Sequence, residues 1–341
     1  MAWHGHVHLL DPTGCGLGLA VGLVGHGHAV RYRGPREWNC EAGETHRMCG
    51  ELARRFTGEP ACESELGDCD LLVIVDVFAD MLDALAHRLN AHAPMRPGDP
   101  LQSTSNPLVY PGRLRFWLEV AQRAPRVAVV DMSDAGGPHE VASELLPQAA
   151  LFARECARDA RGPWRPFPFL YNNVLLWLEH LRPETEWWVP GGQRRFVSDW
   201  AFCGTIDHVR YGDRRRRALA RAVQRWPRLR GALATQIPFV DVLRVLQATK
   251  FGLDLPGAGE LCFRVHESLA LGTPVLRPEP GSVALAEGLE RVVVADPYAW
   301  EGNDAQAVRS IYARSYGPGA AAAVLLAGAG AQAHGEWAAH G

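Results

Sequence analysis

The sequence predicts an α/β protein of two domains, each built on a doubly wound parallel β-sheet. Two observations carry this expectation. β-branched apolar runs alternate with helical patterns in both halves of the chain, and 341 residues suit two domains of roughly 150 residues each. We expect a first domain at residues 1–150, a second at residues 151–316, and an alanine- and glycine-rich tail at residues 317–341 whose last dozen residues are frayed.

The first half of the chain begins with the pattern of a βαβ unit. A glycine-rich turn separates an apolar strand from a helix, and a second strand follows the end of that helix. Two later runs are apolar almost without interruption, as strands buried on both faces of a parallel sheet are. The predicted elements are a strand at 5–10, a glycine turn at 11–18, a helix at 19–24, and strands at 29–32, 70–77 and 127–130.

The second half repeats the alternation of helices and strands. Apolar spacing at three and four positions predicts helices, and short apolar runs that follow turn residues predict strands. The predicted elements are helices at 152–160 and 173–181, a strand at 200–203, a basic helix at 214–226, helices at 240–248 and 261–271, and strands at 274–276 and 291–294.

The composition excludes several classes of protein. A formal net charge of -3 provides no overall basic field for nucleic acid or anionic membrane. The eight cysteines contain no Cys-x-x-Cys pair and do not form a disulfide framework, which suits a reducing compartment. The apolar stretch at 320–327 is far shorter than the ~20 residues of a membrane helix. We therefore expect a cytoplasmic protein with no integral membrane segment and no nucleic-acid partner.

The most informative feature is a glycine-rich loop that leads into a helix at residues 250–267. The N–H groups and the positive dipole end of a helix N-terminus suit a phosphate. Arg264 and Glu267 lie one turn apart and share a face, where an arginine can pair with phosphate and a carboxylate can accept both hydroxyls of a ribose. The predicted binding residues of this stretch are Lys250, Gly257, Gly259, Glu260, Arg264 and Glu267.

Two features of this stretch carry an alternative interpretation. Lys250 is the only lysine in the chain. We expect it at the end of the strand before the glycine loop, where it faces a diphosphate as a point charge; a biased codon usage explains its isolation equally well. The helix itself has an ordinary alternative, in which Arg264 and Glu267 form a surface ion pair.

The stretch from Arg264 to Val275, with Arg-x-x-Glu followed by Gly-x-Pro-Val, resembles the nucleotide-sugar-binding region of GT-B glycosyltransferases. It is most similar to the exostosin-like and spore-maturation-protein-like branches of the group 1 glycosyl transferases. The resemblance implies two Rossmann-like domains that face each other across a cleft. It also implies a nucleotide diphosphate sugar as donor, with Glu267 on the donor ribose, the preceding loop on the diphosphate, and no further cofactor. The sequence departs from many retaining members at Gly259, where they carry a glutamate.

Further candidate residues follow strands elsewhere in the chain. The loop around Gly16 resembles the N-terminal glycine loop of the same enzymes, which approaches the donor phosphates. Gly204 resembles the turn that opens their C-terminal domain, and Arg214, in the basic helix that follows, could steer a diphosphate or simply face solvent. Asp11, at the end of the first strand, is a candidate acid/base or acceptor-binding residue, and Asp134, after the strand at 127–130, is a candidate catalytic residue with helix capping as the alternative.

The sequence therefore predicts a metal-independent glycosyltransferase that acts on an unknown acceptor. A catalytically silent relative that binds a sugar or a partner is the first alternative, because Gly259 replaces a glutamate. A dinucleotide-dependent oxidoreductase is the second, although Leu19 occupies the place of the third fingerprint glycine and no acidic residue ends the second strand. We expect no metal site, since the Asp-x-Asp at 68–70 precedes a buried strand as a capping turn does.

Overall fold

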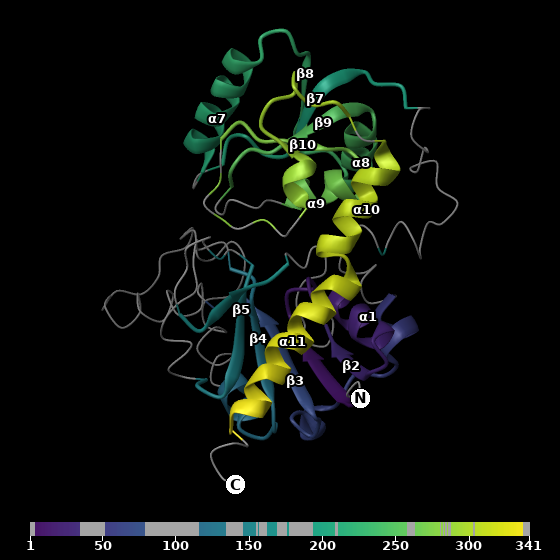
Figure 1. Ribbon diagram of the computed structural model, residues 1–341, viewed down its shortest axis with the longest axis vertical. Helices are drawn as coiled ribbons and strands as arrows, with labels where there is room; N and C mark the ends of the chain where they lie inside the picture. Colours follow the sequence, from purple (N-terminus) through teal and green to yellow (C-terminus); the bar gives the residue numbers. More distant parts are fainter. Residues whose placement is uncertain are drawn as a thin grey trace. The chain divides into compact units, whose positions relative to one another are not determined.

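The computed structural model divides the chain into two compact units (Figure 1). The first unit is Met1–Leu170 together with Ala321–Gly341, and the second is Tyr171–Ala320. The structure describes residues 4–34, 52–78, 116–133, 146–154, 156, 162–168, 176, 194–208, 211–257, 263–279, 281, 283, 285, 288–302 and 304–336. The second unit therefore begins about twenty residues later than the predicted boundary, and the predicted tail belongs to the first unit from Ala321 onward.

The first unit contains a six-stranded parallel sheet in the order β2-β1-β3-β4-β5-β6. The order reverses between β1 and β3, which defines a switch point. β3, β4 and β5 are buried along their whole length, which the apolar sequences of β3 and β4 predict. The elements are β1 His6–Leu10, α1 Leu17–Gly25, β2 Ala29–Arg33, the 3-10 helix η2 Glu63–Glu65, β3 Leu71–Asp76, β4 Val127–Asp131, β5 Ala149–Ala153 and β6 Trp164–Pro166.

The helix predicted to begin at residue 152 is wrong in its first part. Residues Ala149–Ala153 form β5, which pairs with β4 on one side and β6 on the other. A short, wholly apolar run fits a buried strand and a buried helix equally well, and only the neighbouring strands decide between them. Because β5 and β6 complete the first sheet, they also move the domain boundary toward Leu170.

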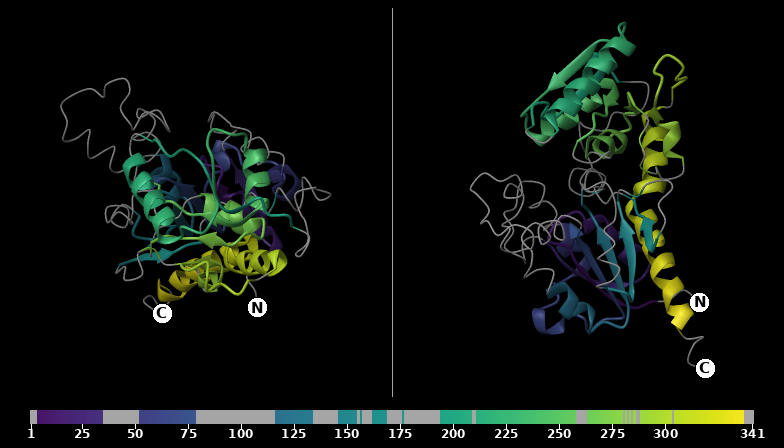
Figure 2. Two further views of the ribbon diagram at one scale, coloured as in Figure 1. Left: turned by 90° about the horizontal axis from the view of Figure 1, so that it is seen from above. Right: turned by 90° about the vertical axis from the view of Figure 1, so that its left-hand side faces the viewer.

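The alanine- and glycine-rich tail forms the long helix α11 Pro318–Glu336, so helical structure continues beyond the point where fraying was expected. Figure 2 shows α11 running along the sheet of the first unit. A side chain at Gly328 would overlap the ring of Phe152, and Arg165 Nη1 donates a hydrogen bond to the Gly328 carbonyl at 3.2 Å. The small residues therefore allow the helix to approach the sheet closely.

The second unit contains a five-stranded parallel sheet in the order β11-β10-β9-β7-β8. Counted along the chain, its strands have the same spatial order as the first five strands of the first sheet, with the switch point between β7 and β9. The predicted class, two doubly wound parallel-sheet domains, is confirmed. The elements are β7 Ser198–Cys203, α7 Gly212–Arg225, β8 Gly231–Ala234, α8 Phe239–Gln247, β9 Thr249–Leu253, α9 Phe263–Ala270, β10 Val275–Leu276, η5 Leu289–Arg291, β11 Val293–Val294 and α10 Ala305–Tyr316.

The expected end of the strand at Lys250 is wrong. Lys250 is the second residue of β9, which continues to Leu253. Gly252, which follows the strand end expected at Lys250, is a buried strand residue, and a Cβ there would overlap the hydroxyl of Ser268 on α9. This glycine therefore serves close packing between strand and helix, and the loop begins only after the strand.

Candidate functional site

The candidate site lies outside the carboxyl ends of β7 and β9, at the switch point of the second sheet. Ligands of doubly wound sheets bind at this position, because the adjacent loops separate there. β7 ends at Cys203 and is followed by Gly204, and β9 ends at Leu253 and is followed by Asp254. Helices α7 and α9 contribute arginine side chains to the same edge.

Arg264 and Gly204 are brought into direct contact. The Nε atom of Arg264 donates a hydrogen bond to the carbonyl of Cys203, and its guanidinium carbon lies 6.0 Å from the centre of the Phe202 ring. Gly204 has φ +150°, and a Cβ added to it would lie 2.5 Å from the Nε atom of Arg264. The backbone conformation therefore favours glycine at this position, and any larger residue would displace the Arg264 guanidinium.

Glu267 lies one turn further along α9 and is 6% exposed. Within the described part of the chain, no hydrogen bond reaches its carboxylate. Burial raises the pKa of Glu267, and the nearby charge of Arg264 partly opposes this rise. The alternative of a surface ion pair is not what the structure shows, because Glu267 is buried and Arg264 donates to the Cys203 backbone. A buried carboxylate without a donor is costly, which suits Glu267 to accept hydrogen bonds from a ligand.

Arg215, rather than Arg214, is the buried arginine of the basic helix. It is 3% exposed, its Nε atom donates to the Pro256 carbonyl at 3.2 Å, and its Nη1 atom donates to the carbonyl of Thr205. Its guanidinium carbon lies 4.2 Å from the centre of the Tyr211 ring. One side chain thus connects the loop after β7 with the loop after β9.

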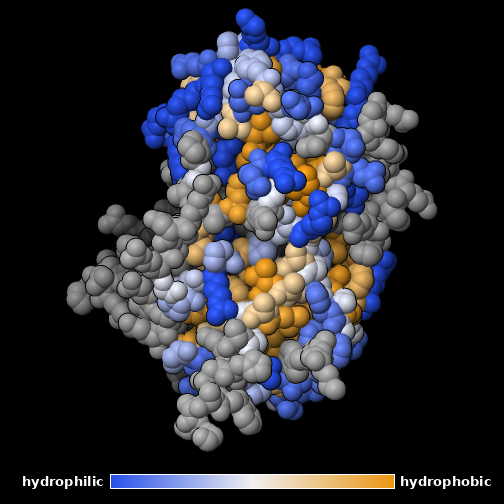
Figure 3. Space-filling model, viewed as in Figure 1, coloured by the Kyte–Doolittle hydropathy of each residue, from blue (hydrophilic) through white to orange (hydrophobic). Residues whose placement is uncertain are grey.

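The sequence itself indicates that Arg215, and not Arg214, is the buried arginine of α7. Ala218 and Ala222 are fully buried and follow Arg215 by three and seven positions, so Arg215 continues the buried stripe of α7. Arg216, by contrast, pairs with Asp207 and Asp213 at the exposed surface. The solvent face of α7 is correspondingly hydrophilic in Figure 3.

Asp254 and Arg277 form a buried ion pair at the same edge of the sheet. The Nε and Nη2 atoms of Arg277 lie 2.9 and 2.8 Å from the Oδ2 atom of Asp254. Burial raises the pKa of Asp254, against the charges of Arg277, Arg215 and Arg264. Sequence reasoning missed Arg277, although its position directly after β10, at the carboxyl end of a parallel strand, was the available signal.

Arg214 and Gly257 lie close to this ion pair. Arg214 lines a small cavity of about 50 Å³ together with Asp254, Pro256 and Arg277. Gly257 is buried directly after Pro256, whose carbonyl accepts a hydrogen bond from Arg215. The structure therefore brings together one set of charged residues, which we name the carboxyl-edge cluster: Arg214, Arg215, Asp254, Arg264, Glu267 and Arg277.

Other predicted site residues lie elsewhere or are not described. Lys250 lies three residues before the end of β9, roughly 10 Å from the carboxyl edge at the rise of a strand, and its Nζ atom pairs with Asp199 at 2.6 Å. It is therefore not part of the carboxyl-edge cluster. Asp134, Gly259 and Glu260 lie outside the described residues.

Asp11 and Gly16 contact each other in the first unit. The carboxylate of Asp11 is fully buried and accepts hydrogen bonds from the backbone N–H of Gly16 at 2.7 Å, from the N–H and hydroxyl of Thr13 at 3.1 and 2.6 Å, and from the Tyr32 hydroxyl at 2.7 Å. Burial raises the pKa of Asp11, and these hydrogen bonds oppose the rise. Asp11 thus shapes the glycine turn, and its catalytic role remains a prediction.

Neither a metal-binding cluster nor a membrane-spanning helix is found in the described residues. Among them, no three histidine, cysteine, aspartate or glutamate side chains are grouped so as to hold a metal ion. No helix in the described ranges has both the length and the apolar character needed to cross a bilayer.

Comparisons with known proteins show a weak structural likeness. No protein-family model and no curated protein matches the sequence. The chain is similar to the crystal structure of AviGT4, a glycosyltransferase involved in avilamycin A biosynthesis, at 13% identity and TM-score 0.45, covering 97% of this chain and 98% of the other. It is also similar to sucrose-phosphate synthase from Thermosynechococcus elongatus, at 12% identity and TM-score 0.35, covering 98% and 99%. The resemblance to the exostosin-like branch remains a prediction.

Proposed function

We propose that the chain is a metal-independent glycosyltransferase of the GT-B kind, which transfers a sugar from a nucleotide diphosphate sugar to an acceptor. The observation that carries this proposal is Glu267, a buried carboxylate without a hydrogen-bond donor in the described part of the chain, one helical turn from Arg264. The resemblance of residues 264–275 to a nucleotide-sugar-binding region supports the same assignment.

Glu267 is proposed to bind the ribose of the donor. The two adjacent hydroxyls of a ribose can donate to the two oxygens of one carboxylate, and such charge-assisted hydrogen bonds are stronger than neutral ones. They would also offset the desolvation of Glu267, whose pKa is raised by burial. This arrangement needs both oxygens as acceptors and therefore an ionised carboxylate. An amide in its place offers only one acceptor oxygen.

Arg264 is proposed to bind the diphosphate. Its Nε atom is used by the Cys203 carbonyl, which fixes the guanidinium against Gly204. No described residue uses its two terminal nitrogens, which form a fork that matches phosphate oxygens. In the carboxyl-edge cluster four arginines face two carboxylates, so the cluster carries an excess of positive charge. Fixed positive charge at this position would stabilise the charge that develops on a leaving diphosphate.

A binding protein without catalytic activity is the second candidate. Gly259, in place of the glutamate of many retaining enzymes, favours it, and so does the saturation of Asp11, whose carboxylate has four donors and no exposed surface. Both candidates require the same nucleotide site. They differ in whether a bound sugar donor is consumed in the presence of acceptors.

The first experiment measures how much UDP, GDP, ADP, their sugar conjugates and NAD raise the melting temperature. The native chain is compared with Glu267→Gln and with the matched control Glu290→Gln, which alters an exposed glutamate of the same unit. One nucleoside diphosphate should stabilise the native chain and the control but not Glu267→Gln. Stabilisation by NAD alone, or by no nucleotide at millimolar concentration, would contradict the proposal. Release of nucleoside diphosphate from the sugar conjugate then separates the enzyme from the silent binder.

A further inference from the structure

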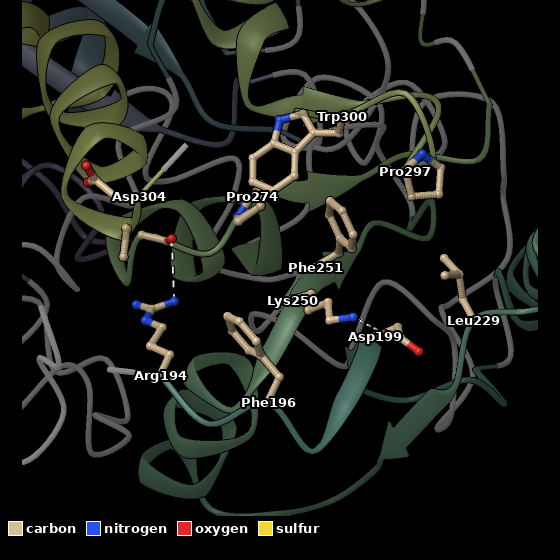
Figure 4. A pocket seen from close by; sticks show the side chains of 12 residues that line it. Arg194, Phe196, Asp199, Leu229, Lys250, Phe251, Pro274, Pro297, Trp300 and Asp304 are labelled. Atoms are coloured by element: carbon tan, nitrogen blue, oxygen red, sulfur yellow. Dashed lines mark hydrogen bonds and ion pairs between the residues drawn. The ribbon is translucent and has the colours of Figure 1, made fainter. Parts of the chain in front are cut away.

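A second cavity of about 420 Å³ lies at the opposite, amino-terminal edge of the second sheet (Figure 4). Arg194 and Phe196 precede β7, Lys250 is the second residue of β9, and Pro274 immediately precedes β10. Its volume is in the range of small-molecule sites. The cavity shares no lining residue with the carboxyl-edge cluster. We propose that this cavity is a separate binding site for a small aromatic carboxylate.

Aromatic rings and prolines form the apolar part of the cavity. Phe251 and Trp300 pack edge to face with ring centres 5.2 Å apart, and the ring of Phe196 is exposed although it lines the cavity. In the view of Figure 4, Phe251 lies between Phe196 and Trp300, with Pro274 and Pro297 nearby. Aromatic side chains favour stacked or edge-to-face contacts with another ring, so a planar ligand fits this lining better than a flexible polar one.

Arg194 gives the cavity its preference for an anion. Its terminal nitrogens donate to the carbonyls of Leu271 and Gly272 and, at 2.9 Å, to the hydroxyl of Thr273, which are all neutral acceptors. Among the described residues no carboxylate pairs with Arg194. Burial lowers its pKa to about 10, so the guanidinium remains charged at neutral pH but is partly desolvated. A partly desolvated cation without a counter-charge favours an anionic ligand.

The other charged groups of the cavity are already compensated. Lys250 pairs with Asp199 at 2.6 Å. Asp304 accepts a hydrogen bond from the Ala307 N–H at 2.7 Å as the N-cap of α10, where the positive end of the helix dipole offsets its charge. Among the described residues of the lining, Arg194 is therefore the charged group that lacks a counter-charge. A ligand ring would lie against Trp300 and Phe196, with its carboxylate toward Arg194.

The single lysine of the chain makes the site directly measurable. Reductive methylation with isotopically labelled formaldehyde keeps the charge of an amine, and Lys250 is the only lysine that it can label. Its NMR signal then reports on the cavity, while the signal of the α-amino group serves as an internal reference. The probe is naphthoate, and naphthamide is the neutral compound of the same shape.

Naphthoate should shift the Lys250 signal saturably and bind at least about tenfold more tightly than naphthamide, as a charge-assisted contact predicts. Trp300→Ala should weaken naphthoate binding by about tenfold or more, whereas Tyr298→Ala, an exposed aromatic of the same segment that does not line the cavity, should leave it unchanged. Arg194→Gln should make the two compounds bind equally.

Three results would each overturn the proposal. They are the absence of a saturable Lys250 shift at millimolar naphthoate, equal affinities for naphthoate and naphthamide in the native chain, and naphthoate binding that Trp300→Ala does not weaken. Because Arg194 also holds the segment after α9, the melting temperature of Arg194→Gln is measured in parallel. The Trp300→Ala result decides the question even where Arg194→Gln is unstable.

Discussion

Replacing Gly204 by alanine should perturb the second unit through two separate effects. The first is backbone strain, because φ +150° is a conformation that residues with a Cβ rarely adopt. The second is a clash, because the new Cβ would lie 2.5 Å from the Nε atom of Arg264. The strain costs about 1–3 kcal/mol, and displacement of the flexible Arg264 guanidinium costs about 1 kcal/mol more through its lost hydrogen bond to the Cys203 carbonyl. Gly204→Ala should therefore lower the free energy of unfolding by about 2–4 kcal/mol.

A matched control separates the two effects. Gly162 has φ +132°, close to the value at Gly204, and a Cβ added there would meet no atom within 4 Å. Gly162→Ala should thus show the strain alone. The clash is measured by a double-mutant cycle with Arg264→Ala, since removal of the guanidinium should reduce the cost of Gly204→Ala to that of Gly162→Ala.

Calorimetry of thermal unfolding measures the free energy of unfolding of each variant. Titration with a nucleoside diphosphate measures its binding affinity. Gly204→Ala should also weaken nucleotide binding, because the clash displaces Arg264 from the Cys203 carbonyl. The reasoning is refuted if Gly204→Ala costs no more than Gly162→Ala, or if the cycle shows no coupling between Gly204 and Arg264.

Three further changes test the carboxyl-edge cluster and its surroundings. Burial raises the pKa of Glu267 above its usual 4.5, so the folded state binds this proton more tightly and stability is lost as pH rises from 4.5 through the raised pKa. Glu267→Gln should therefore melt higher than the native chain at neutral pH, and this gain should disappear as pH falls below 4.5. Arg215→Leu should lower the free energy of unfolding by about 3 kcal/mol, because the carbonyls of Thr205 and Pro256 lose their donor, whereas exposed Arg217→Leu should cost less than about 0.5 kcal/mol in the same denaturation assay. Burial raises the pKa of the Cys203 thiol to about 12; mass spectrometry after brief iodoacetamide treatment should find alkylation at exposed Cys62 and not at Cys203, and the reverse order would contradict the burial.

The parts of the fold that the sequence predicted are those with local signals. The βαβ start, the buried strands β3 and β4, and the helices α7 to α9 follow from apolar periodicity and turn residues within single segments. The proximity of Arg264 and Glu267 also follows from helical spacing alone. These features need no information about which strands become neighbours.

The missed features depend on contacts between distant segments. The apolar run at residues 149–153 fits a strand and a helix equally well, and its pairing with β4 decides between the two. Arg277 and Asp254 pair across two strands, 23 positions apart in the chain. Gly252 lies beyond the strand end expected at Lys250, and Ser268, the residue that leaves room only for glycine there, packs on the strand only in the folded sheet. Sequence spacing cannot specify such pairings.

The carboxyl edges of the two sheets differ in charge, and this difference favours the second unit as the place where a nucleotide's phosphates bind. In the described part of the first unit, three buried carboxylates follow or end the strands. Asp11 accepts from the glycine turn, Asp76 accepts from the Val77 N–H at 2.8 Å and the Trp117 Nε1–H at 2.9 Å, and Asp131 accepts from the Ser133 N–H and hydroxyl at 3.0 and 2.6 Å. Acidic groups that are satisfied by local donors stabilise loops and repel a phosphate.

In the second unit the equivalent edge carries Arg215, Arg264 and Arg277. The charges of all three arginines lower the pKa of the Asp254 carboxyl group, against the effect of burial. Only there does the described part of the chain contain a buried carboxylate, Glu267, that accepts no local hydrogen bond. Two sheets with the same strand order thus use their carboxyl edges differently. The carboxylates of the first edge are satisfied by local hydrogen bonds, whereas the second edge combines arginines with a carboxylate that lacks a donor among the described residues, as the proposed nucleotide site requires.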